Sequence, residues 1–223
     1  MKGIFVTGTD TGAGKTYVTA LIIRALRAEG VDAVGYKPIC CGGREDAYTL
    51  QEASGGDVDL DHINPCYLRT AAAPYVAAMF ENAELELPPL IEGFKELAAE
   101  HEVVIVEGVG GWRVPILKDY MVSDFAKELG LPTILVVGNR LGALNQTLLS
   151  VESMRAAGVE PAGLVFNHLD DELDTAAITN KGIAEELTGV PVLMDVIRGQ
   201  EEVDAWPFEE LVEGKAEIGK AES

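Results

Sequence analysis

The chain has 223 residues, 48% of them hydrophobic, and a formal net charge of −20. This length suits one compact domain, and such an acidic surface disfavours nucleic acid and anionic membranes as partners. No run reaches the roughly 18 apolar residues of a membrane span, and the apolar start lacks the features of a signal peptide, so we expect a cytoplasmic protein. Three cysteines without CxxC spacing indicate neither a disulfide framework nor a zinc site.

Short apolar runs alternate with helical patterns along the chain. The runs, rich in Val and Ile, predict strands at 4–7, 33–37, 103–107, 133–137, 164–167 and 192–196. Apolar residues at helical spacing predict a helix from Lys15 onward and others at 88–100, 123–129, 145–157 and 175–187. This alternation predicts an α/β fold with a mostly parallel central sheet and helices on both faces.

The same pattern predicts how the chain is organised. Residues 1–211 are expected to form a single domain, and 212–223, charged and weakly apolar, a frayed tail. Residues 40–75 read as irregular, and long excursions of this kind usually border the ligand site of an open α/β sheet.

A glycine-rich segment joins the first predicted strand to the first predicted helix. It reads GTDTGAGKT over residues 8–16, a P-loop one residue longer than the common form. Gly12 and Gly14 would let backbone N–H groups surround phosphate oxygens, Lys15 would reach the β- and γ-phosphates, and the Thr16 hydroxyl would bind Mg²⁺. The segment therefore predicts a P-loop NTPase fold that binds ATP; the alternative is a glycine-rich turn that caps a helix.

Two charged residues end other predicted strands. Glu107 precedes four residues that include three glycines, and it is either a metal ligand or a strand-end charge facing solvent. Lys37 precedes Pro38 and would point into the same crevice as Lys15, unless it is a surface lysine. The three histidines have no metal-ligand spacing and read as structural.

These segments together resemble the dethiobiotin synthetases, ATP-dependent carboxylases of biotin synthesis. The resemblance covers residues 1–199 and is carried by VTGTDTGAGKT at 6–16, GYKP at 35–38, VEGVGGW at 106–112 and VVGNRLG at 136–142. It implies that 7,8-diaminononanoate takes up CO₂ as a carbamate, which ATP phosphorylates. The second amine then closes a cyclic urea and releases phosphate.

The resemblance also implies roles for individual residues. Lys15, Lys37 and Thr11 would act on the carbamate and the transferring phosphoryl group, and Thr16, Asp46 and Glu107 would surround Mg²⁺. The nucleotide would meet Gly12, Ala13, Gly14, Lys15, Thr16, Tyr17, Asp46, Glu107, Gly108, Val109, Gly110, Asn167, His168, Ile197, Arg198 and Gly199, with Asn167 reading the base. The diamino acid would meet Cys41, Gly110 and Gly111, and its carboxylate would meet Gly142, Ala143, Leu144 and Asn145 of the partner in a homodimer.

The sequence departs from the family pattern at three places. Cys41 stands where a hydroxyl residue is usual, and 197–199 lack the usual proline of the base-binding loop. The helix around Thr179 offers no tyrosine for the substrate carboxylate.

Two other kinds of protein stay open as alternatives. A partition, cell-division or amide-forming ATPase of the same broad fold is one, although partition-type ATPases carry a second lysine where this chain has Asp10. The other is a nucleotide-binding module without chemistry, which would need neither Lys37 nor Glu107 in the crevice.

Overall fold

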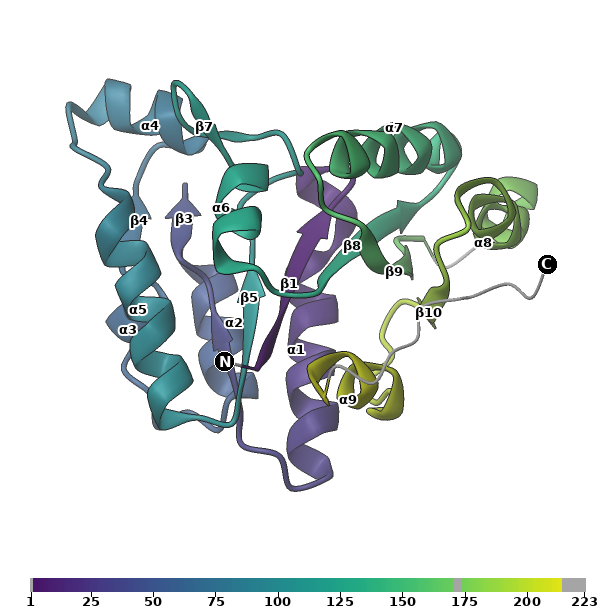
Figure 1. Ribbon diagram of the computed structural model, residues 1–223, viewed down its shortest axis with the longest axis horizontal. Helices are drawn as coiled ribbons and strands as arrows, with labels where there is room; N and C mark the ends of the chain where they lie inside the picture. Colours follow the sequence, from purple (N-terminus) through teal and green to yellow (C-terminus); the bar gives the residue numbers. More distant parts are fainter. Residues whose placement is uncertain (1, 171–173, 214–223) are drawn as a thin grey trace.

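The computed structural model describes residues 2–170 and 174–213, and these build a six-stranded sheet in the order β10-β9-β8-β1-β5-β2. Every pair of neighbouring strands in this sheet is parallel (Figure 1). Its strands are β1 (Gly3–Gly8), β2 (Ala33–Tyr36), β5 (Val103–Glu107), β8 (Thr133–Asn139), β9 (Pro161–His168) and β10 (Val192–Val196).

Helices cover both faces of this sheet, because its central strands are apolar on both sides. Along β1, Ile4 and Val6 pack into one hydrophobic cluster while Phe5, between them, packs into the other. The first cluster is covered by α1 (Lys15–Ala28), α2 (Glu45–Ala53), α3 (Leu60–Ile63) and α9 (Trp206–Glu213). The second is covered by α5 (Leu87–Glu100), α6 (Val122–Leu129), α7 (Ala143–Ala156) and α8 (Thr175–Thr188). The predicted fold class is confirmed.

The segment predicted to be irregular, 40–75, is mostly ordered structure, and that prediction was wrong. It contains α2, α3, part of a parallel pair of strands and the start of another helix. Its elements are too short for periodicity to stand out: α2 buries only Ala47, Leu50 and Ala53. The additional elements are β3 (Ile39–Cys41), β4 (Cys66–Leu68) and α4 (Pro74–Glu81). They lie beyond β2, at the side of the molecule opposite α8 and β10 (Figure 1).

The ends of the predicted elements shift by a few residues. β9 begins three residues before the predicted run, α7 begins two residues early at Ala143, and Lys37 lies just after β2. A small antiparallel pair, β6 (Pro115–Leu117) and β7 (Tyr120–Met121), was not predicted. Within 2–170 and 174–213, no helix is long and apolar enough to cross a membrane.

The C-terminal region departs from the prediction as well. Helix α9 runs two residues into the stretch expected to be frayed, and Val212 packs against the first hydrophobic cluster. Phe208 and Leu211 are buried in the same cluster, which explains why the helix persists there. Residues 214–223 of the expected tail lie outside the described part of the chain.

The carboxyl edge of the sheet gathers the predicted site residues. β1 lies between β5 and β8, so the loops after these three strands meet at one place, where open α/β sheets bind ligands. Lys37 follows β2 at the same edge.

Candidate active site

The phosphate loop is shaped by glycines at its two ends. Gly14 has φ of +84° and begins α1 as its N-cap, a backbone conformation that favours glycine. A Cβ there would also lie 2.0 Å from Nδ2 of Asn167. A Cβ at Gly8 would lie 3.1 Å from side-chain carbons of Lys15, so this glycine leaves room for the lysine to fold back over the strand.

Lys15 is buried within the loop that it would serve. Its Nζ donates a hydrogen bond to the carbonyl oxygen of Asp10 at 3.1 Å, and the residue is 4% exposed. Burial lowers the pKa of Lys15 to about 8, although the carboxylate of Glu107 acts in the opposite direction. A buried ammonium with one carbonyl partner among the described residues is well suited to gain a phosphate oxygen.

A second buried lysine lies between two carboxylates. The Nζ of Lys37 lies 2.5 Å from Oε1 of Glu107 and 2.7 Å from Oδ2 of Asp46. Burial alone would lower the pKa of Lys37, but these two carboxylates raise it above its ordinary value. For Asp46 the directions are reversed. Burial would raise the pKa of this carboxyl, but the Lys37 ammonium holds it below its ordinary value. The structure thus joins residues from β5, α2 and the end of β2.

The oxygens around this cluster fit a magnesium ion. The Thr16 hydroxyl donates to Oε1 of Glu107 at 2.8 Å, while Oε2 is buried without a hydrogen-bond partner among the described residues. In the described ranges no group of three or more His, Cys, Asp or Glu forms a complete metal site. Mg²⁺ in ATP sites usually takes one or two carboxylates and completes its shell with phosphates and water, so this donor set is sufficient.

The glycine-rich segment after Glu107 packs directly against the phosphate loop. A Cβ at Gly111 would lie 3.4 Å from the carbonyl oxygen of Gly8, and Gly110 has φ of +63°. A Cβ at Gly108 would lie 3.1 Å from Val122. The segment can therefore place backbone groups beside a ligand on the loop.

The predicted base-binding residues approach the loop from the other side. Asn167 is buried and its side-chain amide donates to the carbonyl oxygen of Ala13 at 3.0 Å. The Tyr17 hydroxyl, in the first turn of α1, donates to the carbonyl oxygen of Gln200. Thus the segment 197–200 is tied to the helix that begins at the phosphate loop.

His168 is directed elsewhere. Its Nε2 lies 2.7 Å from Oδ1 of Asp195, and Nδ2 of the buried Asn139 lies 3.4 Å from its ring nitrogens. These contacts give the side chain of His168 a structural role. Its backbone follows Asn167 at the end of β9, so only the backbone lies next to the proposed base site.

The predicted substrate residues are only partly brought together. Gly142 is the N-cap of α7 with φ of +92° and no side-chain cap. The N–H of Ala143 donates to the carbonyl oxygen of Arg140 at 3.0 Å, so the N–H groups of Leu144 and the exposed Asn145 are the ones that could meet a ligand. Cys41 lies half-buried at the end of β3, where burial raises its pKa to about 11. Thr11 is exposed in the 3₁₀ turn η1 (Thr11–Ala13), and within the described residues its only hydrogen bond with a side chain is from its N–H to the Asp10 carboxylate.

Sequence reasoning missed three residues at this edge. Arg140, just after β8, lies 3.6 Å from the Asp10 carboxylate in the phosphate loop. Asn64 donates a hydrogen bond to the carbonyl oxygen of Lys37 and accepts one from Arg44, the N-cap residue of α2. Two weak signals existed: the Asn64-Pro65 dipeptide marks a turn but not its neighbours, and Arg140 lies in the segment 136–142 that carries the resemblance.

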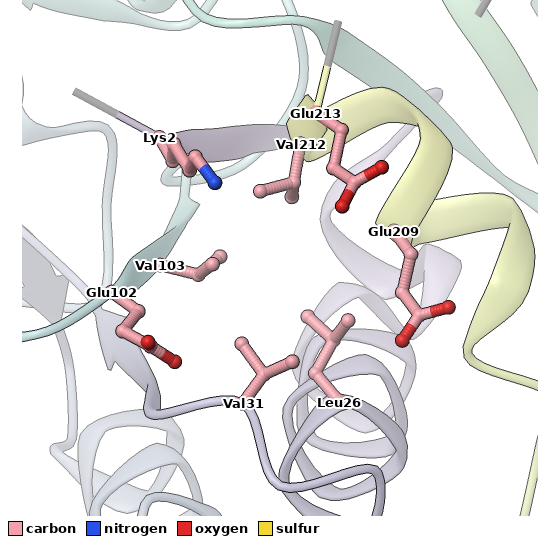
Figure 2. A pocket seen from close by; sticks show the side chains of 8 residues that line it. All are labelled: Lys2, Leu26, Val31, Glu102, Val103, Glu209, Val212 and Glu213. Carbon is pink, nitrogen blue, oxygen red and sulfur yellow. The ribbon is translucent and has the colours of Figure 1, made fainter. Parts of the chain in front are cut away.

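A pocket of about 350 Å³ lies far from this cluster, at the amino edge of the sheet (Figure 2). Lys2, before β1, and Val103, at the start of β5, line it together with Leu26 from the C-terminal half of α1. Glu102 and Glu209 also line it, and carboxylates there would repel the phosphates of a nucleotide. The carboxyl edge is therefore the candidate site.

Comparison with known proteins shows the family and the fold of this chain. The model of a family described as an AAA domain matches residues 2–200. The chain is 47% identical over 204 residues to the ATP-dependent dethiobiotin synthetase BioD of Akkermansia muciniphila, covering 92% of this chain and 96% of that protein. It is 36% identical to the protein of the same name from Methanocaldococcus jannaschii, over 94% of this chain and 99% of that one.

Solved structures of other P-loop ATPases share the fold. A ParA family ATPase from Chlorobium tepidum TLS superposes with a TM-score of 0.55 at 14% identity, over 97% of this chain and 91% of that one. The septum site-determining protein MinD of Pyrococcus horikoshii OT3 gives 0.53 at 15%, over 98% and 99%. At such low identity these likenesses show the fold alone, whereas the sequence relatives are much closer. The chain belongs to the ATP-dependent dethiobiotin synthetase family.

Proposed function

We propose that this enzyme makes the cyclic urea of dethiobiotin from 7,8-diaminononanoate, CO₂ and ATP. One amine adds to CO₂ and loses a proton, which gives a carbamate. A carbamate oxygen attacks the γ-phosphorus of ATP, the bond to the bridging oxygen breaks, and ADP leaves. The second amine then attacks the carbonyl carbon of the mixed anhydride, loses a proton and expels phosphate.

One observation carries this proposal: two buried lysines meet at one edge of a chain with net charge −20. Lys15 lies in the phosphate loop with its ammonium on the carbonyl oxygen of Asp10, and Lys37 lies between Glu107 and Asp46 across the crevice. A nucleotide-binding module without chemistry needs only the first. A second fixed cation suits a reaction in which negative charge develops on a transferring phosphoryl group.

The side chains have separable tasks in this scheme. Lys15 would hold the γ-phosphate, and Lys37 would stabilise the carbamate and the phosphoryl group that moves onto it. A Mg²⁺ held by Thr16, Asp46 and Glu107 would neutralise charge on the β- and γ-phosphates. The glycines at 108, 110 and 111 leave space for the diamino acid, whose reacting end would lie near Cys41 and Thr11.

The nucleotide base would lie beyond Asn167, against the segment 197–199. The link from Tyr17 to Gln200 supports this placement, because it fixes that segment beside the phosphate loop. The segment 197–199 lacks the proline that is usual in the base-binding loop of the family.

We further propose a homodimer that completes each site. The open start of α7 suits the substrate carboxylate, since helix N-termini attract anions. Exposed apolar residues on the same side support an interface: Leu141 is 81% exposed and Ile178, on α8, is 62% exposed. A cytoplasmic location fits an enzyme that consumes ATP.

The proposal is tested by incubating the protein with ATP, bicarbonate and the diamino acid. Phosphate release should require both other substrates, and the product mass should equal that of the diamino acid plus CO₂ minus water. Phosphate release that is the same without the diamino acid would favour a partition-type ATPase. Nucleotide binding without any turnover would favour a binding module.

A further inference from the structure

The backbone of Lys37 is held on both sides by one short segment, 63–66. The N–H of Lys37 donates to the carbonyl oxygen of Ile63 at 2.8 Å. The side-chain amide of Asn64 donates back to the carbonyl oxygen of Lys37, also at 2.8 Å. The next residue, Pro38, restricts Lys37 to extended backbone and accepts from the N–H of Cys66 at 3.2 Å. The position of Lys37 therefore depends on this segment as well as on the central sheet.

Asn64 itself is fixed because its side chain is buried and fully bonded. It is 1% exposed, and its second amide hydrogen bond goes to the carbonyl oxygen of Cys66 at 3.0 Å. Its Oδ1 accepts from Nε of Arg44 at 3.0 Å. A buried amide with donors and acceptor all engaged has one defined orientation.

Arg44 extends this link to the helix that carries Asp46. It is the N-cap residue of α2, and its guanidinium also donates to the carbonyl oxygen of Asn64 at 3.0 Å. Two residues later, the Asp46 carboxylate meets the Lys37 ammonium at 2.7 Å. Asn64 thus holds the backbone beneath Lys37 and, through Arg44, the start of the helix that supplies its partner.

We propose that Asn64 is a positioning residue for phosphoryl transfer, which sets the place of the Lys37 ammonium between Asp46 and Glu107. Asn64 bonds the carbonyl oxygen of Lys37, whereas the ammonium bonds Asp46 and Glu107, so Asn64 acts through the two backbones that it joins. The inference rests on the proposed role of Lys37 in catalysis. It matters because a displacement of about 1 Å in a catalytic group can cost about 100-fold in rate.

The variant Asn64→Asp keeps the shape of the side chain and its contact with Arg44. It replaces the donor amide by oxygen, which faces two carbonyl oxygens and makes neither hydrogen bond. We expect kcat to fall about 10- to 100-fold, because Lys37 is displaced. The KM for ATP should stay within about 2-fold, because the phosphate loop is untouched.

Ser54→Ala is the matched control for lost stability. The Ser54 hydroxyl is buried and accepts a hydrogen bond from the N–H of Gly35, on β2, at 2.9 Å. It donates to the carbonyl oxygen of Leu50, in α2, at 2.6 Å. It therefore joins β2 to α2 as Asn64 does, but away from Lys37. We expect it to lower Tm while kcat stays near that of the wild type.

A double-mutant cycle with Lys37→Gln decides between positioning and general stability. If Asn64 acts through Lys37, Asn64→Asp should change kcat by less than about 2-fold once the lysine is gone. An equal loss in both backgrounds would overturn the inference. A Lys37→Gln enzyme with normal kcat would instead overturn the proposed role of Lys37, and the inference with it.

Should Asn64→Asp not fold, Arg44→Gln tests the same link from the partly exposed end. It removes the hydrogen bonds to Asn64 and leaves the amide of Asn64 in place. We expect kcat to fall up to about 10-fold, with the KM for ATP unchanged. A normal kcat would overturn the inference.

Discussion

The ammonium of Lys37 and the carboxylate of Glu107 form a buried ion pair, 2.5 Å between Nζ and Oε1, in which neither side chain is more than 3% exposed. Such pairs contribute little net stability, because removing both charges from water offsets their attraction. The other oxygen of Glu107 is buried without a hydrogen-bond partner in the described part of the chain. The pair is therefore better explained by the ligands that it is arranged to receive.

Glu107→Gln should raise the Mg²⁺ concentration that the enzyme needs. The amide keeps the size of the side chain and an acceptor for Lys37, but it removes the charge that would attract the metal. We expect the Mg²⁺ concentration for half-maximal rate to rise about 10- to 100-fold. A magnesium titration of phosphate release at saturating substrates measures this.

Glu102→Gln is the matched control for that titration. Glu102 directly precedes β5, so it lies at the opposite edge of the sheet from Glu107, which ends the same strand. Its Mg²⁺ titration should equal that of the wild type. If Glu107→Gln gave the same curve as this control, Glu107 would be an ordinary buried counterion of Lys37.

Lys15 should take up a proton when ATP binds above neutral pH. Burial lowers its pKa to about 8 in the free protein, so part of the population is neutral at pH values near and above 8. The triphosphate favours the charged form and raises that pKa, so binding adds a proton and affinity falls as pH rises through about 8. Titration calorimetry at pH 8.5 in buffers of different ionisation enthalpy should show this uptake.

Lys15→Arg serves as the control for the proton count. Its guanidinium stays protonated throughout this range, so binding should show no buffer-dependent heat even if affinity is lower. Lys37 does not confuse the result, because its raised pKa keeps it charged in both states. Binding heats of the wild type that do not depend on the buffer would contradict the prediction.

Tyr17→Phe should weaken ATP binding and leave the chemical step intact. The change removes the hydroxyl that ties the segment 197–200 to α1 through Gln200. Loss of one hydrogen bond of about 0.5–1.5 kcal/mol would raise the KM for ATP about 2- to 12-fold. Steady-state kinetics should show kcat near normal, and the exposed Tyr48→Phe should change neither constant. An unchanged KM for ATP would show that the segment 197–200 does not contribute to binding of the base.

The central sheet and the phosphate loop could be predicted because both are local patterns. The run at 4–7 can be recognised from its own apolar residues, and residues 12–16 of the phosphate loop are consecutive in the sequence. The wrongly predicted region, 40–75, has short helices that are stabilised by contacts with residues far away in the sequence. Arg44 and Asn64, for instance, are joined only when α2 and α3 pack together.

The same distinction separates the site residues. Glu107 and Lys37 could be proposed because each ends an apolar strand, and parallel strands bring their carboxyl ends together. Their direct contact, 70 residues apart, could not be read from either segment. The partner of His168 could not be read from the sequence for a related reason, because Asp195 lies on the neighbouring strand β10.

The last prediction concerns the shared site of the proposed homodimer. Asn145→Glu places a negative charge in the first turn of α7, where the substrate carboxylate would bind. The KM for the diamino acid should rise, while ATP binding should stay unchanged. Ser153→Glu, which puts the same charge in a later turn of the helix, should leave both constants near their normal values.

Mixing two impaired variants, at a diamino acid concentration well below the KM of Asn145→Glu, then tests whether each site uses both subunits. Lys15→Ala removes the phosphate contact in the site of its own chain. Asn145→Glu weakens the carboxylate contact that its α7 would make in the partner's site. In a mixed dimer, one site combines the intact phosphate loop of the Asn145→Glu chain with the intact α7 of the Lys15→Ala chain. Random exchange of equal amounts makes half of the dimers mixed, so about a quarter of the wild-type activity should return. If subunits exchange, as shown by mass spectrometry of differently labelled chains, and no activity returns, the carboxylate must be held within one chain.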